Sequence, residues 1–538
     1  MTANGDPKSD GDVERGRIAG RAGVVAAGTL LSRVLGLVRD QVIAAMFSRA
    51  VTDAFFVAFT IPNVLRQLLA EGAVQNAVLP VLAEVREREG DDGARRFFRA
   101  MRGLSLCVLV VVSALGVVFA PVLVELFAGG FRDQPGQFER TVELTRWVFP
   151  YIFFMGTAAL GVAALNTYHR FVATSFAPAL LNVSFILFSL LLPGWLGARG
   201  YDTGLALAAA VLVGGVLQVI AQWPSLRRIG FFQAPSLAFS HPGVRTVLGR
   251  MTPMLFGMGV YYIDTVLARR FLSELGTGAQ SYFSWALRLC DFPQGIFVMA
   301  LSTAALPSLS RLAARDDRVE LGKTFAFGMR LALFVALPAT ALVAALAEPI
   351  VMLLFQRGAF DAEATRETGR ALLAQGLGIW AVAGVRQLVA VYYALGDTRT
   401  PVIVAALDLC VFVGLALGLK GPFGHVGVNA AVAGASIAQF LLLWWWLGRR
   451  LPSRHVLEIG GSALRVLAAS SIAAFAGRFT VQAVAVGPEA PAGARLVPGL
   501  SGSLVFVVVF LLAAFVLRSP ELLALKNALG RRLSRRAR

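Results

Sequence analysis

The chain has 538 residues, of which 57% are hydrophobic and only 15% are charged, and its formal net charge is +18. A soluble domain carries about 25% charged residues, so this composition excludes an ordinary soluble protein and a soluble catalytic domain. Most of the sequence divides into apolar stretches of about 20 residues or more, each long enough to cross ~30 Å of hydrocarbon. The sequence therefore predicts an all-α integral membrane protein.

The apolar stretches predict about 14 transmembrane helices. In chain order, the predicted helices cover residues 24–47, 60–85, 103–128, 141–167, 174–193, 203–226, 247–272, 280–308, 326–355, 368–395, 400–419, 426–448, 461–482 and 500–518. No cleavable signal peptide is expected, because the first apolar run carries Arg33 and Arg39 and no small-residue cleavage site follows it closely.

Basic residues collect in alternate connections between the predicted helices, which sets the orientation in the membrane. With a cytoplasmic N-terminus, the connections at 86–102, 227–250, 311–323 and 449–454 are cytoplasmic, and each is rich in arginine. An even number of helices places the C-terminus on the same side. The net charge therefore indicates topology rather than a nucleic-acid partner, since it is spread over many short loops.

Three pairs of prolines in similar local sequence indicate an internal repeat. The pairs are Pro80 and Pro307 (307 − 80 = 227), Pro121 and Pro349 (349 − 121 = 228), and Pro178 and Pro401 (401 − 178 = 223). This offset equals six predicted helices, so the two halves share one topology. The repeat predicts two pseudo-symmetric six-helix lobes around a central cavity, which suits alternating access. A duplication that only enlarged the bundle is the alternative.

The predicted organisation follows from this repeat. Residues 24–228 form the first lobe with helices 1–6, and residues 229–450 form the second lobe with helices 7–12. Residues 451–519 hold helices 13 and 14. Residues 1–23 and 520–538 are cytoplasmic tails, of which the second is basic.

Charged residues inside the predicted helices mark the candidate binding site, because an ionisable residue at the membrane centre costs at least ~2.5–3.5 kcal/mol. The residues identified are mainly arginines, whose guanidinium groups stay charged and bind phosphate through two parallel hydrogen bonds. We therefore predict an anionic cargo that carries a phosphate or diphosphate. The predicted cargo contacts are Arg33, Arg39, Arg66, Arg288 and Arg386. For Arg33, extension to the cytoplasmic face is the alternative.

Acidic residues accompany several of these arginines, and we expect them to orient the arginines rather than to touch cargo. They are Asp40, Glu71 and Asp291. Asp53 lies near the outer end of helices 1 and 2, where it either gates the cavity or caps a helix. A purely structural ion pair is the alternative for Arg39 with Asp40. The same alternative holds for Arg288 with Asp291.

No enzyme signature is found in the sequence. The segment LGKT at 321–324 lacks the preceding glycine of a phosphate-binding loop, because that position is Asp317. The four histidines are scattered, so neither a metal site nor a cofactor is predicted. The pairs Asp91–Asp92 and Asp316–Asp317 lie in charged loops, which argues against a metal-dependent lipid-phosphate transferase.

Two segments at the first two helices carry a family resemblance. The sequence resembles the MurJ (MviN) family of lipid II flippases, in the multidrug/oligosaccharidyl-lipid/polysaccharide exporter superfamily, at SRVLGLVRDQVIAAMF and TDAFFVAFTIPNVLRQLLAEGAVQNAVLPVLAE. The resemblance continues in RLCDFPQGIF, ALPSLSRL, LLFQRGAF and YYALGDTRTPV, and covers about residues 24–450.

This resemblance implies a function in peptidoglycan biosynthesis, cell wall biogenesis and cell shape. The family moves lipid II, an undecaprenyl-diphosphate-linked peptidoglycan precursor, from the inner to the outer leaflet of the bacterial cytoplasmic (inner) membrane. A transporter rather than an enzyme is therefore expected, with many membrane passes and both termini in the cytoplasm.

The resemblance also assigns individual residues. The positions that match the family's cavity arginines are Arg33, Arg39, Arg66 and Arg288, and the matching acidic positions are Asp53, Glu71 and Asp291. Members often have a second arginine where this chain has Gln67, so Gln67 is a supporting residue without charge. Arg49 stands in FSRA where members often have FGAG, and it adds a charge on the outer side.

The expected driving force is the membrane potential or an ion gradient. The expected partners are lipid II and membrane lipids, and contacts with the cell-wall synthesis machinery are a further expectation. Three alternatives stay open: a flippase for another polyprenyl-diphosphate-linked oligosaccharide, an exporter of drug cations, and a non-transporting scaffold for cell-wall assembly.

Overall fold

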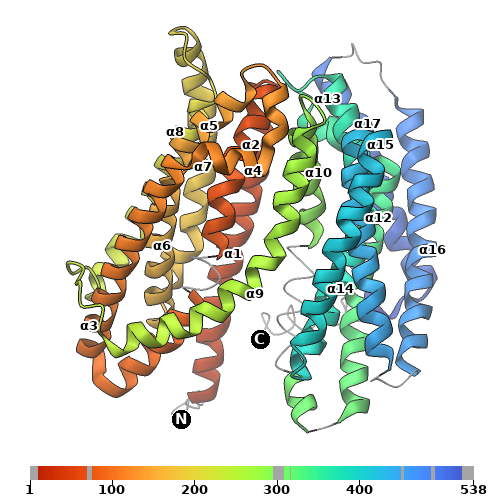
Figure 1. The fold of residues 1–538 in the computed structure, drawn as a ribbon. Coiled ribbons are helices and arrows are strands. Elements are labelled where there is room, and N and C mark those ends of the chain that lie inside the picture. Colours follow the sequence, from red (N-terminus) through yellow and green to blue (C-terminus); the bar gives the residue numbers. More distant parts are fainter. Residues whose placement is uncertain are drawn as a thin grey trace, which may run out of the picture. The chain divides into compact units, whose positions relative to one another are not determined.

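The computed structural model of the chain describes residues 10–68, 75–294, 308–315, 317–449, 454–485 and 491–523 (Figure 1). The chain divides into two compact units, Met1–Tyr262 and Ile263–Arg538. Within the described ranges the secondary structure is helical and contains no strand, as the predicted all-α class requires.

In the part of the first unit that the structure describes there are eight α-helices, a short 3-10 helix and most of a ninth α-helix that continues into the second unit. These elements are α1 (Asp10–Met46), α2 (Arg49–Arg66), α3 (Gln75–Val118), α4 (Ala120–Ala128), η2 (Gly129–Asp133), α5 (Gln137–Val148), α6 (Tyr151–Thr167), α7 (Phe171–Gly197), α8 (Leu205–Arg228) and α9 (Pro242–Ser273). The main elements of the second unit are α10 (Ala279–Pro293), α12 (Arg318–Phe355), α13 (Ala362–Gly376), α14 (Ile379–Ala394), α15 (Arg399–Gly448), α16 (Arg454–Ala483) and α17 (Ala492–Val516).

Nine helical segments among the described residues are long and apolar enough to cross a membrane. The chain is therefore a multi-pass membrane protein, whereas the predicted number of 14 spans is not confirmed. One reason is that α3 and α15 each comprise two helices that meet at a glycine with positive φ, Gly90 at 71° and Gly424 at 56°. Glycine adopts this conformation at little steric cost, so each long element holds two predicted helices or parts of them.

The two halves of α15 fold back on each other after Gly424. A Cβ atom at Gly427 would collide with the carbonyl oxygen of Leu419. Further from the turn, a Cβ atom at Gly434 would lie only 2.7 Å from Cδ1 of Leu415. The residue pairs run in opposite directions, so α15 is an antiparallel hairpin in which small residues allow close approach.

In the first unit, α7 packs against α1 and α8, while α6 packs against α3 and α8. The connection between α8 and α9, residues 229–241, crosses α3 and is called the α8–α9 strap. Its Ser236 N–H donates to the carbonyl oxygen of Arg99 at 3.0 Å, and Nε of Arg99 donates back to the carbonyl oxygen of Ala234 at 3.0 Å. Phe231 of the strap is 2% exposed and packs edge-on against Phe98 of α3. The strap is thus fixed to α3 by polar and apolar contacts.

In the second unit, α12 packs against α13, α14, α16 and α17. Beyond α17, Glu521 is only 3% exposed and accepts hydrogen bonds from Ser462 of α16 and from Ser519, both at 2.8 Å. Nε of Arg330 on α12 lies 3.5 Å from the same carboxylate. We call this group of four residues the Glu521 clasp. It joins the C-terminal helices to α12, so α16 and α17 belong to the core of this unit.

Candidate functional site

Arg39 lies on α1 with only 11% of its side chain exposed. Its Nε and Nη2 donate to Oδ1 of Asp40 at 2.8 and 2.7 Å, and its Nη1 donates to Oδ1 of Asn182 on α7 at 3.1 Å. The guanidinium carbon lies 5.3 Å from the ring centre of Phe185. Asp40 therefore holds Arg39 in one orientation. This contact is the ion pair given in the sequence analysis as the structural alternative for these two residues.

Asn182 links α7 to two points on α1. Its Nδ2 donates to the carbonyl oxygen of Ser32 at 2.8 Å, while its Oδ1 accepts from Arg39. A Cβ atom at Gly36 would lie 3.8 Å from the same amide nitrogen, so Asn182 sits directly against α1. The sequence prediction did not include Asn182, because an uncharged amide in an apolar helix gives no signal until its partner is known.

Arg33 lies on the same helix in a different environment. Its side chain is partly exposed, and it makes no hydrogen bond or ion pair with another residue in the described part of the chain. A guanidinium group stays charged at any physiological pH. Arg33 is thus a cation on a predicted membrane helix with no acidic partner among the described residues, which suits an anionic ligand.

The end of α2 contains two further predicted residues. Nε of Arg66 donates to Oδ1 of Asn63 at 2.9 Å, one turn earlier on the helix. The next residue, Gln67, accepts a hydrogen bond through Oε1 from the hydroxyl of Tyr262 on α9 at 2.8 Å. Gln67 therefore contributes an acceptor here, in a contact that a second arginine at this position would not make.

Asp53 and its neighbours lie at the other end of α2. Asp53 is fully buried at 0% exposure in the second turn of the helix. The N-cap of α2 is Ser48, so Asp53 does not cap its own helix, and the gating role stays a prediction. Arg49 begins α2 and is partly exposed. Glu71 lies outside the described residues.

In the second unit, the structure places Arg288 and Asp291 together on the exposed side of α10. Arg386 lies on α14, is partly exposed, and makes no hydrogen bond or ion pair with another residue that the structure describes. Arg386 therefore resembles Arg33, since neither of these predicted cargo contacts has an acidic partner among the described residues.

The helices of the second unit hold charged residues that the sequence prediction did not select, among them Asp264, Arg269 and Asp408. Oδ1 of Asp264 on α9 and Oδ1 of Asp408 on α15 are each buried without a hydrogen-bond partner in the described part of the chain. Arg269 on α9 is 6% exposed, and its Nη1 donates to Ser284 on α10 at 2.8 Å. A charge within an apolar run was the signal that selected the other arginines, and the same signal would have found all three.

The acidic pair considered for a lipid-phosphate transferase has other partners. Asp91 accepts from the Tyr168 hydroxyl at 2.7 Å and from Nε of Arg86 at 3.0 Å, and Asp92 pairs with Arg95 at 2.9 Å. Burial and the hydrogen bond to Asp91 raise the pKa of Tyr168 to about 12, so its hydroxyl keeps its proton at neutral pH. Both carboxylates are therefore engaged in holding the connection near Gly90, and no group of metal ligands occurs among the described residues.

Comparison with known proteins gives a family match along most of the chain. Residues 42–489 match the family model described as "Lipid II flippase MurJ". The chain belongs to the MurJ family. A protein of Burkholderia cenocepacia named lipid II flippase MurJ is 36% identical over 459 residues, which cover 82% of this chain and 87% of that protein. The family resemblance predicted from the sequence is therefore confirmed.

Solved structures agree with a MurJ fold. A structure titled "Lipid II flippase MurJ, inward closed conformation" matches with a TM-score of 0.73 at 22% identity, covering 92% of this chain and 98% of that chain. An inward-facing multidrug resistance MATE family transporter of the MOP superfamily matches with a TM-score of 0.65 at 14% identity, covering 80% and 95%. At these identities the likeness supports the fold alone. The MurJ family itself is named for flippase activity, which is transport rather than catalysis.

Proposed function

We propose that this protein flips lipid II from the inner to the outer leaflet of the bacterial cytoplasmic membrane. The family match over residues 42–489 carries this proposal, together with the relatives named lipid II flippase MurJ. The multi-pass helical fold is consistent with it, because such a cargo must cross the hydrocarbon core with its head group shielded. The distribution of basic residues supports a cytoplasmic position for both termini in this proposal.

In this proposal, arginines bind the diphosphate of the cargo. A diphosphate carries more than one negative charge, and guanidinium groups bind phosphate in a bidentate manner. Arg33 and Arg386 support this role because neither is neutralised by an acidic partner among the described residues. Arg39 would act in the orientation that Asp40 and Asn182 give it.

Transport would proceed by alternating access of the two lobes, with the polyprenyl tail remaining in lipid. The membrane potential is a sufficient source of energy, since moving one elementary charge across 100 mV is worth ~2.3 kcal/mol. Coupling to an ion gradient is the alternative. Asp264 and Asp408 give that alternative two half-buried carboxyl groups in the second unit, each with one oxygen that has no hydrogen-bond partner among the described residues.

The decisive experiment measures lipid II exposed on the outer leaflet of cells that depend on this protein alone. Arg33→Ala should reduce exposure at least about tenfold, because a charged hydrogen bond is worth about 1.5–3 kcal/mol. Arg33→Lys keeps the charge and should retain part of the activity. Arg146→Ala on α5 is the matched control, since Arg146 is an exposed arginine without a described partner.

Two outcomes would contradict the proposal. If the wild-type protein inserts correctly but exposes no lipid II, a flippase for another polyprenyl-diphosphate-linked oligosaccharide becomes the leading account. If Arg33→Ala and Arg146→Ala are equally active at matched expression, Arg33 does not contact the cargo. A scaffold for cell-wall assembly would tolerate both substitutions.

A further inference from the structure

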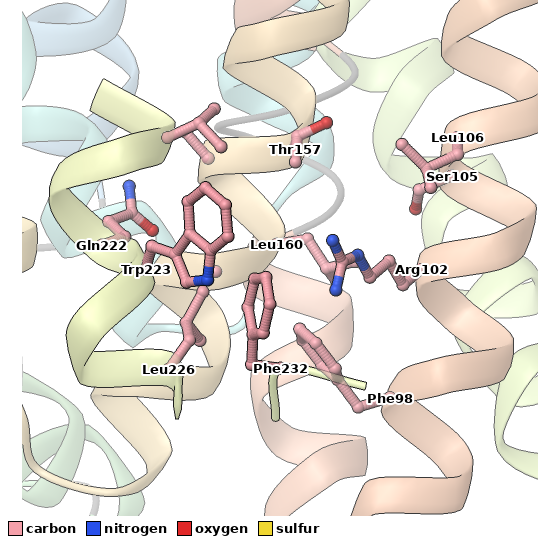
Figure 2. Close-up of a pocket in the computed structure, with 13 residues that line it drawn as sticks. Phe98, Arg102, Ser105, Leu106, Thr157, Leu160, Gln222, Trp223, Leu226 and Phe232 are labelled. Carbon is pink, nitrogen blue, oxygen red and sulfur yellow. The ribbon is translucent and has the colours of Figure 1, made fainter. Parts of the chain in front are cut away.

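A partly open hollow lies in the first unit, between α3, α6 and α8 and beneath the α8–α9 strap. Figure 2 shows its lining, which comes mainly from the apolar side chains of Phe98, Leu160, Trp223 and Phe232. The volume is about 160 Å³. Because Arg102 also lines it, the hollow is called the Arg102 pocket.

The size of the Arg102 pocket limits what it can hold. A cavity of about 150 Å³ in another protein accommodates benzene, whereas pockets for drug-sized ligands measure about 300–1,000 Å³. The Arg102 pocket therefore holds a few methylene groups of one hydrocarbon chain. It is too small for a sugar-peptide head group, so it is not the cargo site proposed above.

Arg102 gives this apolar pocket a positive charge. Figure 2 shows its guanidinium group pointing into the pocket from α3, towards the rings of Phe232 and Trp223. Nη1 donates to the carbonyl oxygen of Gln233 in the strap at 3.1 Å, and the guanidinium carbon lies 5.8 Å from the centre of the Phe232 ring. No acidic residue in the described part of the chain pairs with Arg102, so its charge is left to a ligand or to solvent.

A second, open hollow adjoins the pocket at Trp223. Its lining is Ile220, Trp223, Pro224, Arg227 and Arg228, all near the C-terminal end of α8. The Trp223 ring stacks on Phe232 at 4.6 Å and forms a wall shared with the Arg102 pocket. Tryptophan beside arginines is typical of the membrane–water interface. Basic pockets between membrane helices on the cytoplasmic side bind anionic lipid head groups, and this end of α8 is predicted to be cytoplasmic.

The Arg102 pocket thus combines an apolar lining with a positive charge at its side. Phosphatidylglycerol combines acyl chains with an anionic phosphate, and so matches both features of the site.

We propose that the Arg102 pocket binds one anionic phospholipid of the inner leaflet. The first methylene groups of one acyl chain, next to the head group, fill the apolar hollow. The phosphate binds Arg102, and Arg227 and Arg228 lie beside it. Because Arg102 also holds the strap through Gln233, the lipid would stabilise the connection from α8 to α9.

The test is lipid binding to the purified full-length protein, measured by native mass spectrometry with phosphatidylglycerol and with phosphatidylcholine of the same chains. Wild type should retain one phosphatidylglycerol with at least about fivefold preference, equivalent to about 1 kcal/mol. Arg102→Gln should remove this preference. Ser105→Phe should weaken binding of the lipid by filling the pocket from α3 without changing any charge.

Arg99→Gln is the matched control, because Arg99 also donates to a carbonyl oxygen of the strap but does not line the pocket. It should bind phosphatidylglycerol as wild type does. Equal losses in Arg99→Gln and Arg102→Gln would overturn the proposal, as would equal retention of the two lipids by wild type. Unchanged binding by a folded Ser105→Phe protein would also overturn it. If Ser105→Phe does not fold, the two arginine variants decide. None of these measurements depends on lipid II transport.

Discussion

At the scale of single residues, the two arginines of α1 differ in how their charges are compensated. Arg39 donates two hydrogen bonds to Asp40 and a third to Asn182, whereas Arg33 has no such partner among the described residues. A buried charge that keeps its partner is tolerated, and one that loses it is costly. Arg39 therefore combines a structural role with any contact to cargo, while Arg33 is the cleaner probe of anion binding.

Asn182 offers a direct test of that structural role. Asn182→Ala removes the acceptor for Arg39 and the donor to Ser32, and should lower stability by about 1–3 kcal/mol. Thermal unfolding of the purified protein in detergent would measure the loss. Leu191→Ala on the same helix is the control, because Leu191 is 71% exposed. An equal melting temperature for both variants would show that the link between α7 and α1 contributes nothing.

At the scale of elements, a sharp turn at one glycine joins the two helices of α15 into an antiparallel hairpin. Gly424 has φ of 56° and ψ of −137°, a region that residues with a Cβ atom avoid. The return half of α15 then approaches so closely that Gly427 has no room for a side chain against Leu419. The sequence predicts both apolar halves as separate helices, because hydropathy shows where the chain is apolar but not how tightly two spans are joined.

The turn at Gly424 should tolerate no side chain without strain. Gly424→Ala should lower stability by about 1–3 kcal/mol, because a φ of 56° with a ψ of −137° lies in a region that residues with a Cβ atom rarely adopt. Gly421→Ala is a matched control three residues earlier, where nothing lies within 4 Å and φ is not positive. Melting temperatures of the two variants would be compared by size-exclusion chromatography after heating. The interpretation fails if Gly421→Ala is the more damaging change.

At the scale of the whole molecule, the C-terminal helices are an integral part of the second unit. Residues from α12, α16 and the segment after α17 meet in the Glu521 clasp, although they are up to 191 positions apart in sequence (521 − 330 = 191). Phe334 of α12 also packs against Phe510 of α17 at 5.5 Å. Loss of the clasp should therefore loosen the contact of α16 and α17 with the rest of the unit.

Glu521→Ala should lower stability by about 1–3 kcal/mol, because it leaves two buried serine hydroxyls and Arg330 without their shared acceptor. Glu143→Ala on α5 is the control, since Glu143 is exposed. Limited proteolysis would report whether α16 and α17 become accessible earlier on heating. Identical cleavage of the two variants would show that the clasp does not hold these helices.

Hydropathy predicted the all-α membrane class of the fold, and charge within apolar runs selected the candidate arginines. Both are local properties of the sequence. The partners of those arginines were not predictable in this way. Asn182 reaches Arg39 from 143 positions away, and Tyr262 reaches Gln67 from 195 positions away. Asp264 and Asp408, by contrast, carry the same local signal as the arginines, a charge within an apolar run, so the sequence alone is sufficient to identify them.

The turn at Gly424 also bears on how the chain enters the membrane during synthesis. At about 5–20 residues per second, the two halves of α15 leave the ribosome within about 1–5 s of each other. Because the turn is so tight, no loop separates the two halves, and the second half cannot stay on one side of the insertion channel while the first enters the membrane. The two halves should therefore enter lipid as one unit, and the orientation of residues 399–423 decides that of residues 425–448.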